Sequence, residues 1–105
     1  MELSRVILEN LPIPVIGVSA ENMIVLTNKE VQSLGRNGHR IELGRGLGDF
    51  FSTDVEEKTT EALQSKTPME IERFSLFGKD FNIELMPLKG RFQGQGVIMA
   101  LKSIE

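Results

Sequence analysis

The first eleven residues carry apolar side chains at the spacing of an α-helix. Four of them fall at positions i, i+3, i+4 and i+8: Leu3, Val6, Ile7 and Leu11. This spacing puts the four side chains on one stripe of an α-helix, and Pro12 cannot continue that helix. We therefore predict a flanking helix over residues 1–11, followed by a domain over residues 12–105.

The next segments have the residue composition of β-strands. Val15–Ser19 and Met23–Thr27 are rich in β-branched side chains, and the turn-forming residues between them predict a hairpin. Thr27 and Glu30 have the spacing of a capping box, so a short helix is expected over Lys29–Leu34.

The middle of the chain is rich in glycine before it becomes helical. Arg36–Gly48 contains four of the ten glycines, so we expect a loop with one helical turn before Phe50. Thr53 and Glu56 match a second capping box and predict a longer helix, which Thr67-Pro68 ends. The buried stripe of that helix is predicted to hold Val55, Thr59, Ala62 and Leu63.

The last third of the sequence is predicted to form strands. Three segments have the length of strands: Met69–Phe77, Lys79–Leu88 and Gly96–Ile104. Gly78-Lys79 predicts a tight turn between the first two, and Pro87 indicates a strand end or a bulge because proline cannot donate to a ladder. The apolar positions slip by one residue after Ile71, which predicts a β-bulge.

Two of the five strands are apolar on both faces. Val15–Val18 and Val97–Leu101 show no polar face, whereas Lys79–Leu88 alternates cleanly. A strand that is apolar on both sides needs cover on both sides. We therefore predict an α+β (α/β) fold in which these two strands lie at the centre of a five-stranded sheet. Helices would cover one face, and the N-terminal helix or a partner chain would cover the other.

Composition narrows the possible chemistry. The chain has no cysteine and a single histidine, His39, which excludes disulfides, thiolate catalysis and multi-histidine metal sites. Its net charge of −3 lacks the basic excess of a nucleic-acid binder. The longest apolar run, Val97–Leu101, is too short to span a bilayer, and no signal peptide is visible. We expect a cytoplasmic domain with no direct contact with nucleic acid or membrane.

Four motifs occur in a recognisable order. Pro14–Asn28 is a hairpin that ends on asparagine, Gly44–Phe51 precedes the long helix, Phe77–Phe81 contains a glycine turn, and Gly96–Leu101 forms the last strand. In order and spacing they resemble PAS domains, the sensory modules of many bacterial histidine kinases and transcription regulators. The resemblance covers almost the whole chain.

The resemblance implies a five-stranded antiparallel sheet and a regulatory role in signal transduction. The module would sense a signal or small ligand and relay it by homodimerisation to an effector domain of a histidine kinase or transcription regulator. Its dimer interface would be the N-terminal stripe of Leu3, Val6, Ile7 and Leu11. The alternative is a ligand-free module for protein interaction or dimerisation.

A ligand cavity in such a domain would be lined by apolar side chains of the strands and helices. The candidates are Val18, Val25, Leu34, Phe51, Leu63, Phe74, Phe81, Ile83, Val97 and Met99. The same residues suit a densely filled core, which is the default state of a protein interior and the interpretation we favour.

The sequence lacks the residues that usually carry haem or flavin chemistry. The predicted long helix has no histidine to ligate haem, and His39 lies in a loop. Flavin adduct chemistry of the light-sensing kind needs a cysteine that this chain lacks. We therefore expect no cofactor and no metal, with a haem or flavin sensor as a less favoured alternative.

Charged residues offer candidates for anion binding and for catalysis. Arg36, Arg40 and Arg45, together with His39, could converge on an anion or phosphate, but nearby Glu42 and Asp49 favour a loop whose charges balance. No set of nucleophile, base and orienting group can be assembled from this sequence, so we expect no enzymatic activity.

Overall fold

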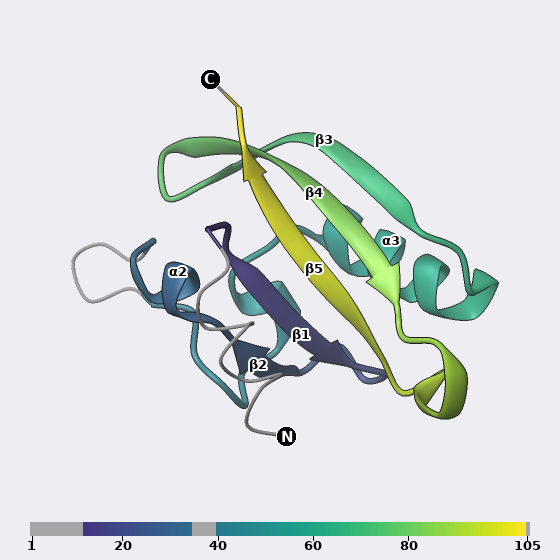
Figure 1. The fold of residues 1–105 in the computed structure, drawn as a ribbon. Coiled ribbons are helices and arrows are strands. Elements are labelled where there is room, and N and C mark those ends of the chain that lie inside the picture. Colours follow the sequence, from purple (N-terminus) through teal and green to yellow (C-terminus); the bar gives the residue numbers. More distant parts are fainter. Residues whose placement is uncertain (1–11, 35–39, 105) are drawn as a thin grey trace.

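A five-stranded antiparallel sheet with helices on one face forms the body of the protein, which confirms the predicted fold class (Figure 1). The computed structural model describes residues 12–34 and 40–104, so the helix predicted over residues 1–11 lies outside the described residues. The elements in chain order are β1 (Val15–Ser19), β2 (Ile24–Thr27), α2 (Lys29–Gln32), the 3₁₀ turn η1 (Leu47–Asp49), α3 (Thr53–Ser65), β3 (Met69–Leu76), β4 (Lys79–Pro87), the 3₁₀ turn η2 (Gly90–Phe92) and β5 (Gly96–Ser103).

The strands lie in the order β2-β1-β5-β4-β3. The strand β5 is therefore the middle one, and β1 lies between β2 and β5, as their two apolar faces predicted. Figure 1 shows α3 behind β4 and β5, and we call this covered side of the sheet the inner face. No helix within residues 12–34 and 40–104 is long and apolar enough to cross a membrane.

Inward-facing residues of neighbouring strands build the core. The register pairs Ile16 with Met99 and Ile83 with Leu101, and all four side chains are fully buried. The helix α3 contributes Val55 from the covering layer. Alternation along each strand thus places one apolar side chain in every inward position of the central strands.

The N-caps of both helices lie one residue away from the predicted caps. The N-cap of α2 is Asn28, whose Oδ1 accepts from the Val31 amide at 3.3 Å. The N-cap of α3 is Ser52, whose Oγ accepts from the Val55 amide at 3.4 Å. The capping boxes predicted at Thr27 and Thr53 are therefore wrong by one residue. The residue after Thr27 is Asn28 and the residue before Thr53 is Ser52, and both residue types are also good N-caps.

Asn28 joins the start of the domain to α2. Its Nδ2 donates to the Ile13 carbonyl at 2.8 Å, and its Oδ1 also accepts from the Val15 amide at 3.0 Å. The Asn28 amide in turn donates to the Val15 carbonyl at 3.1 Å. The residue is 1 % exposed, so these bonds satisfy a polar side chain that would otherwise be costly to bury.

The β3–β4 hairpin contains the predicted bulge and a turn shifted by one residue. Ile71 pairs with Ile83 but Phe74 pairs with Phe81, so β3 carries one extra residue between them. The central turn residues are Phe77 and Gly78, with φ of 51° and 80°, and not Gly78-Lys79. Two positive φ values are the signature of the primed turns that match the twist of a hairpin. The end of β4 at Pro87 is confirmed.

Candidate functional site

Nine of the ten residues predicted to line a ligand cavity belong to the inner face or its margin. Six are buried in the core: Val18, Phe51, Phe81, Ile83, Val97 and Met99. Three are partly buried and pack against it: Leu34, Leu63 and Phe74. The rings of Phe51 and Phe74 stack in a tilted geometry with centroids 5.4 Å apart. These residues form a continuous packed cluster, and a ligand-binding role for them stays a prediction.

Val25 is the exception and corrects the predicted set. The ladder pairs Gly17 with Leu26 and Val18 with Ile24, which leaves Val25 as the extra residue of a bulge in β2. Its side chain is 55 % exposed. A bulge moves a side chain out of the regular alternation, so Val25 does not line the core.

The face of the sheet opposite α3, which we call the outer face, has a row of apolar residues across four strands. Leu26, Gly17, Ile98 and Met86 are successive cross-strand partners on β2, β1, β5 and β4. A shallow groove of about 450 Å³ lies over part of this row, and we call it the outer groove. It is lined by Gly17, Val18, Ser19, Val25, Leu26, Leu88, Gln95, Gly96, Val97 and Ile98.

Two glycines let the strands beside the outer groove approach closely. A Cβ atom at Gly17 would lie 2.9 Å from the Cβ of Leu26, and one at Gly96 would lie 2.5 Å from the carbonyl oxygen of Val18. Both contacts are too short for a real side chain. Glycine in a strand interior often marks such a close approach, and the missing side chains deepen the groove.

The residues predicted to form a dimer interface are Leu3, Val6, Ile7 and Leu11, and all four lie outside the described residues. The sequence predicts that the N-terminal stripe or a partner chain covers the outer face. Of the groove residues, it singles out only Val18, Val25 and Val97, and those as candidates for a cavity in the core. Their signal was the apolar character of both faces of β1 and β5.

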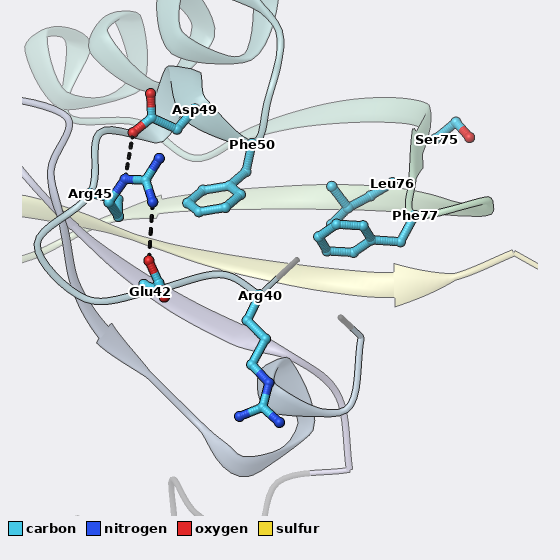
Figure 2. A pocket seen from close by; sticks show the side chains of 8 residues that line it. All are labelled: Arg40, Glu42, Arg45, Asp49, Phe50, Ser75, Leu76 and Phe77. Carbon is cyan, nitrogen blue, oxygen red and sulfur yellow. Dashed lines mark hydrogen bonds and ion pairs between the residues drawn. The ribbon is translucent and has the colours of Figure 1, made fainter. Parts of the chain in front are cut away.

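A second concave site lies between residues 40–50 and the end of β3 (Figure 2). This rim cleft has a volume of about 430 Å³ and is lined by Arg40, Glu42, Arg45, Asp49, Phe50, Ser75, Leu76 and Phe77. The guanidinium of Arg45 is fixed there by two carboxylates. Its Nε donates to Asp49 Oδ2 and its Nη1 to Glu42 Oε1, both at 3.0 Å, while its central carbon lies 5.4 Å from the Phe50 ring centre.

The charges of the rim cleft are therefore mostly paired, as the balanced-loop interpretation predicted. The hydrogen bond to Asp49, and then the one to Glu42, raises the pKa of the Arg45 guanidinium above its ordinary value. Figure 2 shows the Arg40 side chain extending away from Phe50, so Arg40 and Arg45 do not converge. Arg36 and His39 lie outside the described residues.

Phe77 enters the rim cleft from a strained backbone. Its φ of 51° lies in the left-handed region, which a bulky L-residue rarely adopts and which costs about 1–2 kcal/mol. Asparagine or glycine is the usual choice at this turn position. The Phe77 side chain is half-buried and packs against the core, and this contact offsets part of the cost.

No protein-family model matches this chain, and no curated protein matches it. Solved structures do. The PAS domain of nitrogen regulation protein NR(II) from Vibrio parahaemolyticus is 16 % identical with a TM-score of 0.73, and the match covers 99 % of this chain and all of that one. The PAS domain of histidine kinase ThkA is 22 % identical with a TM-score of 0.67, over 87 % of this chain and 98 % of that one.

A third structure shows a PAS-like unit within a larger assembly. Histidine kinase ThkA in complex with response regulator protein TrrA is 25 % identical with a TM-score of 0.69, over 94 % of this chain but only 30 % of that kinase chain. The five-stranded architecture and these similarities show that the chain has the fold of a PAS domain, as its motifs predicted.

Proposed function

We propose that this chain is a sensory and regulatory module that relays a signal by homodimerisation to an effector domain. The effector would belong to a histidine kinase or a transcription regulator. The PAS fold supports the sensory role, since solved structures with this fold include PAS domains of histidine kinases. One of those kinases is in complex with a response regulator, which supports a place in two-component signalling.

The observation that carries the proposal is the outer groove. Its floor is apolar, its flanking residue Val25 is 55 % exposed, and it lies over β1 and β5, the strands with two apolar faces. Exposed apolar surface of this kind marks an interaction site. The amphipathic segment 1–11 immediately precedes β1 in the sequence, so it is the natural part of the chain to associate there in the dimer.

The same strands connect the groove to the core. In β1 the inward Ile16 neighbours the outward Gly17, and in β5 the inward Met99 neighbours the outward Ile98. A change in core packing therefore displaces the outer surface directly, because interiors are too dense to absorb it. The relay can be no larger than the difference in the signal's affinity for the two packing states.

Sedimentation of the full chain tests the dimer. The expected mass is twice 11.7 kDa. Ile98→Lys places a charge in the outer groove and is expected to give a monomer, because burying an unpaired ammonium is costly. Asn82→Lys, on the outer-facing side of β4 at the polar end of the sheet, is the matched control and should stay dimeric. A monomeric parent chain, or dissociation by both variants alike, contradicts the proposal.

A ligand-free interaction module is the second candidate, and the packed inner face favours it. Native mass spectrometry of the purified chain separates the two. A small molecule retained in a defined ratio supports ligand sensing. Repeated absence of any ligand, with the dimer intact, supports a module that works through protein contacts alone.

A further inference from the structure

The rim cleft has two aromatic walls. Phe50, just after η1, and Phe77, at the tip of the β3–β4 hairpin, are both half-buried, and Figure 2 shows their rings on either side of the space between the loop and the hairpin. A volume of about 430 Å³ falls within the range of small-molecule sites. Aromatic side chains on two sides of one space suit a flat ligand group, since aromatic systems prefer offset-stacked or edge-to-face contact.

The backbone at Phe77 adds an independent observation. The φ of 51° is strained for phenylalanine, and the next residue, Gly78, shows the kind of side chain this turn accepts without strain. Folding stability alone therefore does not explain a phenylalanine here. Strained residues of this kind persist where the surroundings fix them, and they cluster at ligand clamps.

The charges of the rim cleft indicate the sign of the ligand. Glu42 and Asp49 are both occupied by Arg45. Arg40 lines the cleft and makes no ion pair or side-chain hydrogen bond with another residue in the described ranges. This guanidinium is therefore the positive group left to pair with a ligand. In Figure 2 it extends away from Phe50, so it has to reorient on binding, as interface side chains commonly do.

We propose that the rim cleft binds a small planar anion of the aromatic carboxylate class. The ring lies between Phe50 and Phe77, and the carboxylate pairs with Arg40, a geometry that guanidinium groups favour. This inference rests on the proposed sensory function and gives it a ligand class and a site. The site lies at the edge of the domain and is separate from the core residues first predicted to line a cavity.

Amide chemical shifts of the full chain test the site with three probes of one size. These are 1-naphthoate, neutral 1-naphthalenemethanol and cationic 1-naphthylmethylamine. We expect saturable shifts at Phe50, Leu76 and Phe77, with naphthoate binding about tenfold more tightly than the amine, the size of one charge-assisted hydrogen bond. Arg40→Gln should remove this preference for the anion, and Arg91→Gln, an exposed arginine on η2, should leave it unchanged.

Phe77→Asn separates binding from folding. Asparagine adopts the left-handed conformation readily, which offsets the lost packing of the Phe77 ring against the core, so the variant is expected to melt close to the parent while naphthoate binding falls at least about tenfold. Phe92→Asn removes a more exposed phenylalanine from η2 and serves as the control. Unchanged binding by Phe77→Asn, shifts confined to the core or the outer groove, or no shifts with any probe would each overturn the cleft. The sedimentation result is read separately, so a dimer without naphthoate binding overturns only this inference.

Discussion

The two faces of the sheet are built from the same strands but differ in what covers them. On the inner face, Ile83 and Leu101 are fully buried in the cluster beneath α3. On the outer face, Ile98 is half-buried and Met86 is 38 % exposed. In β5, for example, the buried Met99 faces the packed core while its half-buried neighbour Ile98 lines the outer groove.

The outer face is itself divided. Over β2, β1, the start of β5 and Met86 it is apolar, whereas over the rest of β4 and the end of β5 it is polar, with Glu84 paired to Lys102 at 2.9 Å. A strand that is polar on one side needs only one cover, and a strand that is apolar on both sides needs two. The association surface of the proposed function is therefore expected on the half of the outer face formed by β2, β1 and β5.

Matched isoleucine truncations make the most direct comparison of the two faces. Ile83→Ala is expected to lower the free energy of unfolding by about 2–5 kcal/mol, because it leaves a cavity in a packed interior. Ile98→Ala removes the same atoms from the outer groove and should cost about 1 kcal/mol. Urea unfolding at low protein concentration measures both. Equal losses would contradict the comparison, since they would mean that both faces are covered alike.

The strands were predictable because their signal is spread over many residues. Alternation located β3 and β4, and a continuous apolar run located β5, each to within one residue at both ends, while the slip after Ile71 located the bulge. Such a signal is redundant, so one misplaced residue does not hide it. The packing of the inner face follows from the same alternation.

Features that depend on one residue were predicted less well. The motif at Thr53 and Glu56 fits a capping box, yet Ser52 is the actual N-cap, because neighbouring residues can all cap and tertiary contacts choose between them. The turn at Phe77-Gly78 places a bulky residue where the sequence rules expect glycine or asparagine. The charged residues of the rim cleft were candidates from the sequence, but its wall at Phe77 depends on that exception, so no sequence pattern pointed to the aromatic side of the cleft.

Two asparagines extend the comparison to polar side chains. Asn28→Ala should lower the free energy of unfolding by about 2–3 kcal/mol, because it removes a helix cap and leaves buried backbone groups at Ile13 and Val15 without partners. Asn82→Ala removes a single acceptor, at 3.0 Å from the exposed Arg73 amide, and should cost about 0.5–1 kcal/mol because water replaces it. Thermal unfolding of the two variants measures the difference. An Asn82→Ala loss as large as that of Asn28→Ala would show that the outer side of the hairpin is not solvated.

The smallest expected effect concerns the charged half of the outer face. The Lys102 and Glu84 side chains are 51 % and 37 % exposed, so their ion pair lies in a largely aqueous environment. A double-mutant cycle with Lys102→Met and Glu84→Gln should give a coupling free energy of about 0.2–1 kcal/mol. At about 1 M salt the screening length falls to about 3 Å, so most of this coupling should disappear.

The salt dependence of this coupling decides which half of the outer face associates. If the dimer forms over β2, β1 and β5, the Glu84–Lys102 pair stays in water and its coupling remains small and sensitive to salt at every protein concentration. If the partner instead covers β4, the pair is buried in the dimer, where screening is weak and removing one partner leaves an unpaired charge. A coupling that grows with protein concentration and resists salt would therefore move the association surface from the apolar half to the charged half.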